Sequence, residues 1–315
     1  MKILIVCSGK PSNPNWNFPY NGKFIYEQAE SLKKLGVDYD TYFIEGKGIL
    51  GYLKNYRNMI KKIDEYTPEL VHAHYGLSGL LATFQRQVPV IVTFHGDDIN
   101  DKKYRIFSLL ASLLSTENIF VHKMLAKKIK YIKRPNIIAC GVDKNIFFPI
   151  DKKVARKKLG LDLEKKYALF TSPFSVYVKN APLAQASIAK SKYAIELIEL
   201  TGYSREEVCL LMNAVDFLLI TSHSETGPLV AKEALCCHCP IVSVDVGDVK
   251  KLTANVEGCY ISPSDSDELA KYINRVIEEN MRIDGSDKIE KYTMDKVAKR
   301  VLKIYQKVLK IKELG

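Results

Sequence analysis

The sequence has no hydrophobic run long enough to cross a membrane. A spanning helix needs roughly 20 consecutive apolar residues, whereas the best candidate, residues 106–114, is far shorter and contains Ser108 and Ser112. The apolar run at residues 3–7 is soon interrupted by glycine, lysine and proline, so it is too brief for the core of a signal peptide. We therefore expect a cytoplasmic protein, one that can still act at the inner face of a membrane.

A disulfide framework is also missing. The seven cysteines are odd in number and scattered, which is typical of reduced thiols. Cys236, Cys237, His238 and Cys239 form a local cluster and raise the alternative of a zinc site. Adjacent cysteines at a helix end point in different directions, and no second pair lies at the spacing of a zinc finger or ribbon. We interpret them as small packing residues and expect no metal ion.

What the chain does have is enough apolar material for two cores. It contains 315 residues, 47% of them hydrophobic and 10% aromatic, and this length is typical of two domains. Strand-like and helix-like segments alternate throughout, which predicts α/β units with parallel, doubly wound sheets. The alternation breaks near residue 150. We predict two Rossmann-like domains facing a cleft, residues 1–149 and 150–292, and an amphipathic helix at 293–315 that packs back on the first domain.

The formal net charge of +11 indicates an anionic partner. Much of the positive charge lies in the first half of the chain, where residues 124–134 form a predicted basic helix. Leu125, Ile129 and Ile132 fall on one stripe of it, as in helices that lie on a membrane surface. A solvated helix over a domain core has the same pattern, so both interpretations stay open. No aromatic-interleaved RNA motif accompanies the charge, and we do not expect nucleic acid as a partner.

The most informative segment is residues 222–235. Glu225 and Glu233 lie eight positions apart, with Gly227 and Pro228 between them and an apolar strand-like run on each side. This pattern predicts a strand-loop-helix-strand unit whose first helical turn, with free backbone N–H groups, suits a phosphate. Two carboxylates would repel that phosphate unless they hold neutral groups such as sugar hydroxyls. A nucleotide sugar offers both, although either glutamate alone would be an ordinary surface acid.

Other candidate residues also lie at strand or helix ends. His74, His95 and Asp98 follow two apolar strands and should project at the carboxyl edge of the first sheet. Gly22 precedes a helix, where backbone N–H groups can meet a pyrophosphate. Lys179 precedes the first helix of the second domain, and its long side chain can neutralise phosphate charge.

In this order the segments resemble the GT-B-fold retaining glycosyltransferases of family 4, over nearly the whole chain. Asn21-Gly22 resembles the glycine loop of that family, residues 71–74 its D-x-x-H-x-H strand and residues 95–98 its H-G-x-D segment. Residues 141–149 are similar to its G-V-D-x-x-x-F-x-P interdomain signature, and residues 225–233 to its E-x7-E motif. The last two in this order are the strongest signal.

The resemblance implies a role for each candidate, listed here by ligand. The ribose hydroxyls of the donor would be held by Glu233, and the donor sugar hydroxyls contacted by Glu225. The diphosphate would bind Lys179, with Gly227, Pro228 and Leu229 lining it and Gly22 approaching from the first domain. His95 would contact the transferred sugar near the reacting carbon, and Asp98 would support the acceptor side.

The resemblance also implies a metal-independent enzyme with no cofactor beyond its substrate, a UDP- or GDP-sugar. The acceptor would be a glycan or a lipid-linked glycan, as in polysaccharide biosynthesis, with peripheral contact to an anionic membrane. The departing diphosphate would be stabilised by Lys179 and a helix amino end, which is electrostatic preorganisation.

Three departures from the family pattern keep alternatives open. The family has an arginine a few residues ahead of the phosphate-binding lysine, but residues 171–178 contain none. Glu69 stands at the first position of the D-x-x-H-x-H pattern, and Asn21 replaces a glycine. A non-catalytic nucleotide-sugar-binding partner subunit and a nucleotide-sugar 2-epimerase are therefore the alternatives to a glycosyltransferase.

Overall fold

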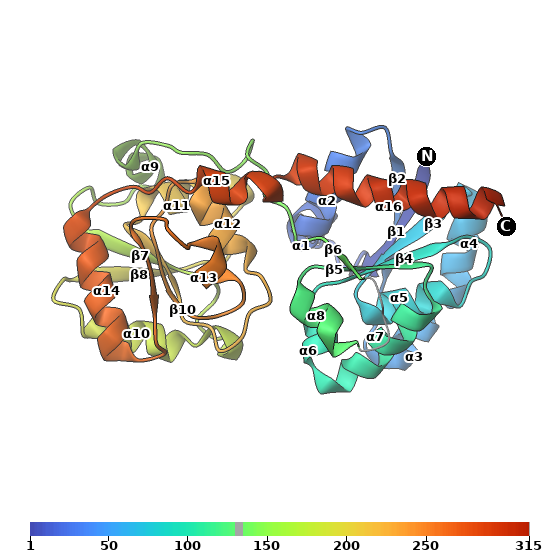
Figure 1. The fold of residues 1–315 in the computed structure, drawn as a ribbon, viewed down its shortest axis with the longest axis horizontal. Helices are drawn as coiled ribbons and strands as arrows, with labels where there is room; N and C mark the ends of the chain where they lie inside the picture. Colours follow the sequence, from blue (N-terminus) through green and yellow to red (C-terminus); the bar gives the residue numbers. More distant parts are fainter. Residues whose placement is uncertain (130–134, 315) are drawn as a thin grey trace. The chain divides into compact units, whose positions relative to one another are not determined.

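The computed structural model describes residues 1–129 and 135–314, which form two α/β units (Figure 1). The first unit comprises Met1–Gly141 and the helix that begins at Met294, and the second comprises Val142–Thr293. Each contains one parallel sheet with helices on both faces. The predicted α/β class with two doubly wound sheets is confirmed.

The sheet of the first unit has the strand order β2-β1-β3-β4-β5-β6. Its strands are β1 (Lys2–Ser8), β2 (Asp38–Ile44), β3 (Leu70–His74), β4 (Val90–Phe94), β5 (Glu117–Phe120) and β6 (Asn136–Ile137). Every residue of β3 and β4 is buried, because helices cover both faces of a parallel sheet. The helices are α1 (Phe18–Asn21), α2 (Lys23–Lys33), α3 (Gly48–Leu53), α4 (Tyr56–Tyr66), α5 (Gly76–Thr83), α6 (Asp97–Asn100), α7 (Lys102–Leu114), α8 (Lys123–Lys128) and α16 (Met294–Leu314).

The sheet of the second unit has the order β11-β10-β9-β7-β8. Its strands are β7 (Lys166–Phe170), β8 (Ile195–Glu199), β9 (Phe217–Ile220), β10 (Ile241–Val244) and β11 (Cys259–Ser262). The helices are α9 (Lys152–Leu159), α10 (Ala181–Ala189), α11 (Arg205–Ala214), α12 (Leu229–Cys236), α13 (Val249–Leu252), α14 (Ser266–Glu279) and α15 (Ser286–Ile289), with the 3-10 turns η1 (Tyr177–Lys179) and η2 (Glu290–Tyr292).

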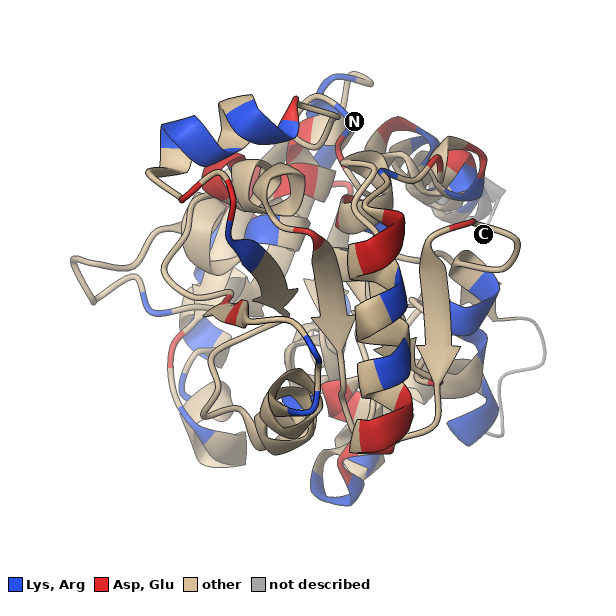
Figure 2. Ribbon diagram, turned by 90° about the vertical axis from the view of Figure 1, so that its left-hand side faces the viewer, with Lys and Arg blue, Asp and Glu red and all other residues tan. Residues whose placement is uncertain are grey.

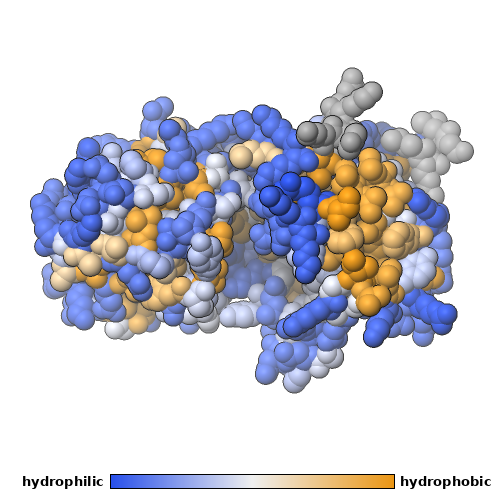
Figure 3. All heavy atoms as spheres, turned by 90° about the horizontal axis from the view of Figure 1, so that it is seen from below, coloured by the Kyte–Doolittle hydropathy of each residue, from blue (hydrophilic) through white to orange (hydrophobic). Residues whose placement is uncertain are grey.

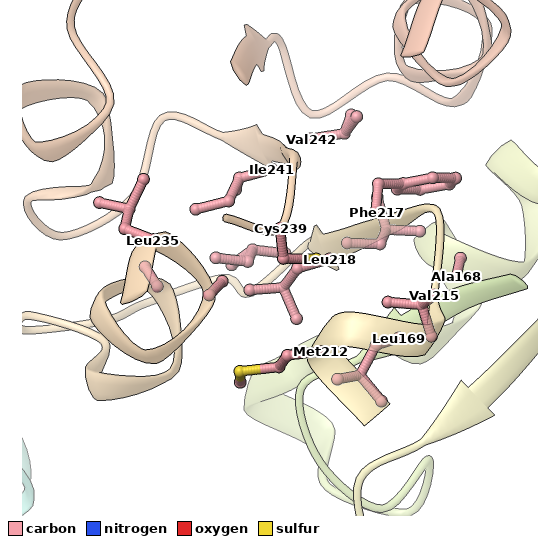
Figure 4. Close-up of a cluster of buried hydrophobic side chains, with 14 of the residues drawn as sticks. Ala168, Leu169, Met212, Val215, Phe217, Leu218, Leu235, Cys239, Ile241 and Val242 are labelled. Atoms are coloured by element: carbon pink, nitrogen blue, oxygen red, sulfur yellow. The ribbon is translucent and has the colours of Figure 1, made fainter. Parts of the chain in front are cut away.

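One part of the core of the second unit lies where α11 and α12 cover β7, β9 and β10, and α10 and α14 bury apolar residues in the same core. Figure 4 shows apolar side chains from α11, α12, β7, β9 and β10 converging on one another. Cys236, Cys237 and Cys239 are buried in this core, so they pack as small apolar residues. Among residues 1–129 and 135–314, no group of three histidine, cysteine, aspartate or glutamate side chains is placed to share a metal ion.

The chain passes from the first unit to the second earlier than the alternation of elements predicts. Val142 and Phe147 are fully buried in the core of the second unit, so the boundary lies between Gly141 and Val142, eight residues before 149. The chain returns at Met294, and α16 buries Val297, Val301 and Tyr305 against the first sheet. Its amphipathic pattern therefore serves the first core.

The interpretation of residues 124–134 as a membrane-facing helix is wrong for the part that the structure describes. Helix α8 ends at Lys128. Leu125 and Ile129 are buried in the first core, and the lysines of α8 are exposed. The stripe is thus the core-facing side of a solvated helix. Lys130, Ile132, Lys133 and Arg134 lie outside the described residues. No helix in ranges 1–129 and 135–314 is long and apolar enough to span a bilayer.

Candidate active site

Each sheet has one point where its strand order reverses, and parallel sheets bind ligands at the carboxyl ends of the strands that flank such a point. In the first unit these strands are β1 and β3, and in the second they are β7 and β9. His74 ends β3 and His95 follows β4. Lys179 follows β7, and Glu225 follows β9. Each unit therefore brings its predicted site residues to the expected edge.

The first unit has a cavity of about 690 Å³ at this edge. It is lined by the end of β1, the loops that follow β3 and β4, and the first turns of α2, α3 and α7. Tyr52, Tyr75 and Tyr104 supply aromatic surface, while Asp97 and Asp101 supply carboxylates. Aromatic rings beside hydrogen-bonding side chains suit a hydroxyl-rich ligand such as a sugar.

His95 is held by a second histidine. Its Nε2 lies 2.9 Å from Nδ1 of His74, and its ring packs against Phe24 and Tyr75. Burial and the neighbouring His72 lower the pKa of His95 to about 3, and burial lowers the pKa of His74 well below its usual range. Both rings are therefore neutral near pH 7, so His95 offers a hydrogen bond and not a positive charge.

Asp98 does not point freely toward an acceptor. Its Oδ2 accepts the Gly76 N–H at 3.0 Å and its Oδ1 accepts the Gly96 N–H at 2.9 Å. Burial raises the pKa of Asp98 to about 6, against the effect of these backbone hydrogen bonds. The carboxylate lines the cavity, but its hydrogen bonds join the loops after β3 and β4. Its geometry is that of a residue that positions Tyr75 and His95.

A third histidine, His72, packs against His74, and its two hydrogen-bonding partners, Tyr305 and Thr93, were not predicted from the sequence. His72 Nδ1 lies 2.6 Å from the Tyr305 hydroxyl of α16, and His72 Nε2 lies 2.7 Å from Thr93 Oγ1. The ring of His72 packs 4.4 Å from that of His74. The signal in the sequence was the single tyrosine on the apolar stripe of α16, since a buried tyrosine hydroxyl requires a partner.

Gly22 lies at the cavity, but its own N–H is engaged. It donates to the Phe18 carbonyl at 2.8 Å, and Gly22 caps the start of α2. A Cβ at this position would lie 2.6 Å from the Phe18 ring, so packing already requires a glycine here. A contact between Gly22 and a diphosphate stays a prediction.

In the second unit, Lys179 and Glu225 form an ion pair. Lys179 Nζ lies 2.5 Å from Glu225 Oε1, which also accepts the Ser222 hydroxyl at 2.8 Å. The Lys179 backbone carbonyl accepts the Thr221 hydroxyl at 3.0 Å. The loops after β7 and β9 are thus joined through both side chain and backbone of Lys179.

Helix α12 runs from Leu229 to Cys236, and Pro228 is its N-cap. Gly227 lies against Asp248, whose Oδ1 would be 3.4 Å from a Cβ at Gly227. Asp248 Oδ1 and Thr171 Oγ1 are buried and find no hydrogen-bonding partner within residues 1–129 and 135–314. Both lie just beyond strands of the second sheet, at its carboxyl edge. Buried polar atoms are rarely left unpartnered, so this edge fits a polar ligand.

Glu233 is buried within α12 and pairs with Arg205. Arg205 Nη1 lies 2.5 Å from Glu233 Oε1, and the guanidinium also lies over the Phe147 ring at 4.5 Å. The sequence interpretation missed Arg205. A signal was present, since Arg205 directly follows the N-cap Ser204, where the helix dipole disfavours a cation.

Two unpaired carboxylates would repel a phosphate bound near them. The two ion pairs remove this repulsion, because each carboxylate has a cation beside it. Glu225 is neutralised by Lys179 and Glu233 by Arg205. The amino-terminal end of α12 therefore carries its N–H groups without a net negative charge next to them, which is the arrangement that an anion would need there. Each glutamate keeps a second oxygen that can accept a hydroxyl.

Two family models match the sequence. The model described as Glycosyltransferase Family 4 matches residues 26–145, and the model described as Glycosyl transferases group 1 matches residues 184–295. TuaC of Bacillus subtilis, whose name assigns it to teichuronic acid biosynthesis as a glycosyltransferase, is 23% identical over 89% of this chain and 90% of its own.

Solved structures share the fold over the full length. The sucrose-phosphate synthase of Thermosynechococcus elongatus superposes with a TM-score of 0.81 at 16% identity, covering 99% of this chain and 100% of its own. HepE of Anabaena, solved in complex with UDP and glucose, superposes with a TM-score of 0.73 at 15% identity, covering 98% and 100%. The matched models and the shared fold show that this chain belongs to the GT-B glycosyltransferases of family 4.

Proposed function

We propose that this glycosyltransferase transfers a sugar from a UDP- or GDP-sugar to an acceptor hydroxyl with retention at the anomeric carbon and without a divalent metal. The observation that carries the proposal is the neutralised pair of glutamates, Glu225 with Lys179 and Glu233 with Arg205, around the start of α12. On one short segment, this arrangement offers carboxylate oxygens that can accept hydrogen bonds from hydroxyls and backbone N–H groups that can donate hydrogen bonds to a phosphate.

In the proposed complex, Glu233 accepts the ribose hydroxyls and Glu225 accepts hydroxyls of the donor sugar. Gly227 and Leu229 line the diphosphate beside Pro228, and Lys179 supplies positive charge to it. Asp248 and Thr171, whose buried oxygens lack partners among the described residues, add further contacts to the donor. HepE, solved with UDP and glucose, supports a uridine donor.

The proposed reaction breaks the bond between the anomeric carbon and the β-phosphate oxygen and forms a bond from the acceptor oxygen to that carbon on the same face. The electron pair leaves with the diphosphate, and the acceptor proton passes to the departing phosphate oxygen. Lys179 and the α12 N–H groups stabilise the charge that develops on the leaving group. Neutral His95 donates or accepts a hydrogen bond at the transferred sugar.

The acceptor is proposed to bind in the cavity of the first unit, where tyrosine rings and carboxylates suit a sugar. A glycan or lipid-linked acceptor in polysaccharide biosynthesis agrees with the teichuronic acid assignment in the name of TuaC. Asp98, which is held by two backbone N–H groups, supports this acceptor side by positioning the loops.

The test is a panel of UDP- and GDP-sugars incubated with the protein, with and without EDTA, and analysed for released nucleotide and for sugar product by NMR. Transfer or donor hydrolysis that survives EDTA, with the anomeric configuration kept, is expected. Inversion of the configuration would overturn the retaining mechanism. Recovery of a 2-epimeric sugar would favour an epimerase, and tight donor binding without turnover in every condition would favour a non-catalytic partner subunit.

A further inference from the structure

A second cavity lies beside the first one in the first unit. Its volume is about 620 Å³, which is within the range typical of small-molecule sites, and the proposed reaction does not use it. Ser8, Asn21, Gly46 and Lys47 line both cavities. The two spaces therefore adjoin at the carboxyl end of β1, and a ligand longer than one sugar can extend from one into the other.

The loop between β1 and α1 forms much of the wall of the second cavity, and its own hydrogen bonds fix it. The Asn13 N–H donates to the Lys10 carbonyl and the Trp16 N–H donates to the Asn13 carbonyl, both at 2.9 Å. The Asn15 N–H donates to Asn13 Oδ1 at 3.0 Å, and Asn17 caps α1. Two successive turns and a helix cap thus hold the side chains of this loop in a defined arrangement.

Trp16 is the only tryptophan of the chain, and close packing holds it in the cavity wall. Its ring meets the Phe43 ring edge to face, with 4.7 Å between the centroids. A Cβ at Gly9 would lie 2.9 Å from Trp16 Cζ2, so the chain has a glycine where the ring needs space. The ring is half-buried and lines the cavity. An aromatic ring fixed in this way can pack against the apolar C–H face of a sugar.

Hydrogen-bonding groups surround this ring. The side chains of Asn13, Asn15 and Asn21 line the cavity, and within residues 1–129 and 135–314 their amide N–H groups donate to no protein atom. The carboxylate of Glu45 lines it as well and accepts the Ser12 hydroxyl. Amides can both donate and accept, so they complement hydroxyl groups, which do the same.

Two lysines of the second cavity are also available to a ligand. Lys10 and Lys47 are exposed, and neither pairs with a carboxylate in the described ranges, 1–129 and 135–314. Charged residues of the second unit behave differently along the outward face of α14, in the foreground of Figure 2, where Lys271 pairs with Glu268. The ammonium groups at the second cavity can therefore donate to the oxygens of a ligand.

This polar lining distinguishes the second cavity from the outer surface of the same unit. Helix α7 turns Ile106, Leu110 and Leu113 outward, where they are 51%, 40% and 56% exposed. Figure 3 shows a broad hydrophobic area on this side of the first unit. Apolar ligands and protein partners favour surface of that kind. The second cavity instead combines one aromatic ring with amides and ammonium groups, and this composition suits a sugar.

We propose that the second cavity binds the second sugar of the acceptor, which is the ring next to the one whose hydroxyl is glycosylated. Trp16 packs on that ring, and Asn13, Asn15 and Asn21 form hydrogen bonds with its hydroxyls. The acceptor is then a glycan of at least two sugars that extends across both cavities. This inference rests on the proposed function, which places the acceptor in the first cavity.

The test uses the fluorescence of Trp16, which reports on the second cavity without any reaction because the chain has no other tryptophan. The probes are glucose with maltose and cellobiose, and N-acetylglucosamine with diacetylchitobiose, each titrated into the full chain without a donor. At least one disaccharide is expected to shift the tryptophan emission until it saturates. That disaccharide should bind roughly tenfold more tightly than its monosaccharide, because it adds one packed ring and its hydrogen bonds.

Two variants test the residues, with calorimetric titration as the readout and thermal unfolding as the check that each variant is folded. Asn15→Ala, at an exposed position, should lose most of the additional affinity for the disaccharide and keep the affinity for the monosaccharide. Trp16→Leu, which keeps an apolar side chain against Phe43, should do the same. The matched control is Asn58→Ala, at an exposed asparagine of α4 that lines neither cavity, and it should bind as wild type does.

Tryptophan emission that no disaccharide of the panel changes would overturn the proposal. Equal affinities for monosaccharides and disaccharides would also overturn it, as would an Asn15 variant that binds disaccharides like wild type. The proposed function fails on a different result, which is the absence of transfer from every UDP- and GDP-sugar. Disaccharide binding that shifts the emission would then still support a sugar site in the second cavity. Transfer to monosaccharides and disaccharides with equal kcat/KM would support the proposed function and contradict the second site.

Discussion

The two units share a strand order but build their ligand edges from different chemistry. Without β6, the first sheet runs in the order second, first, third, fourth, fifth, as the second sheet does. At the edge of the first unit, His74 and His95 are neutral and joined by one hydrogen bond. At the edge of the second unit, Lys179 with Glu225 and Arg205 with Glu233 form ion pairs.

This difference shows that two sheets with the same topology place their site residues at equivalent edges but can differ in the charge of those residues. The first edge suits a ligand without charge near neutral pH, and the second suits a ligand that carries both hydroxyls and phosphates. Mutations at the second edge should therefore act on donor binding and on turnover. Changes at the buried histidines of the first edge should alter the pH dependence of stability and the packing of α16.

The largest effect is expected for Glu233→Ala, which removes the buried carboxylate that pairs with Arg205. Removing one partner of a buried pair destabilises a protein by on the order of 3 kcal/mol, and the donor would lose the ribose contact that we propose for Glu233. Calorimetric titration with UDP and GDP donors, together with thermal unfolding, checks both effects. Glu278→Ala, which breaks an exposed pair with Lys192, is the matched control and should change neither. Full donor affinity in Glu233→Ala would remove Glu233 from the site.

Lys179→Ala is expected to lower kcat roughly 100-fold, as the loss of one preorganised charge at the leaving group does. Donor binding should change less, because the α12 N–H groups remain. Initial rates over a range of donor concentrations separate the two effects. Lys190→Ala, at an exposed lysine paired with Asp267, is the control. A variant with unchanged kcat would show that Lys179 only anchors Glu225.

Acid should destabilise the first unit. Burial lowers the pKa of His72 and of His95 from 6.5 to about 3, so between these values the unfolded chain binds more protons and stability falls as the pH falls. From about pH 7.5 to about pH 5 each contributes a loss of about 2 kcal/mol. Asp98 opposes this, since its pKa rises from 3.8 to about 6 and its protonation favours the folded state over that window.

Calorimetric scans at several pH values check this sign. His72→Gln should flatten the pH dependence of unfolding, whereas His223→Gln, at an exposed histidine of the second unit, should leave it as in wild type. A first unit that gains stability on acidification would contradict the neutral state of its histidines.

The smallest effect is expected for Tyr305→Phe, which removes the hydroxyl that pairs with His72 in the interior. Leaving one buried ring nitrogen without its partner should cost about 1 kcal/mol of unfolding free energy. Chemical denaturation measures this, with Tyr177→Phe as the control at an 86% exposed tyrosine. A loss of unfolding free energy as small as that of the control would mean that His72 finds another hydrogen-bonding partner.

The sequence predicted the element types and the edges at which the candidate residues lie, because both follow from local pattern. Apolar runs gave the strands of both sheets, and Glu225 and Glu233 lie on the loop and helix that their spacing indicates. Lys179 lies next to Glu225, although nothing in the sequence placed the two together. Their contact depends on the pairing of β7 with β9, which sequence spacing does not contain.

The same reason explains what was missed. Arg205 is 28 residues from Glu233 and Tyr305 is 233 residues from His72, so only the fold brings each pair together. The stripe of Leu125 and Ile129 was open to two interpretations because a buried face and a membrane-facing one share a periodicity. Helix α7 shows the reverse, since its leucines have the pattern of a core and lie outside.

The route of the chain has a consequence for how the protein forms. Val142 N–H donates to the Tyr292 carbonyl, and Val142 bridges Thr293, so the second unit starts and stops at adjacent points. Gly141 and Met294 are likewise neighbours in the first unit. During translation the second unit emerges whole and can fold at once. The first must wait with Ile3, Leu70 and Ile91 uncovered until Val301 and Tyr305 have left the ribosome, and in that interval it depends on protection from aggregation.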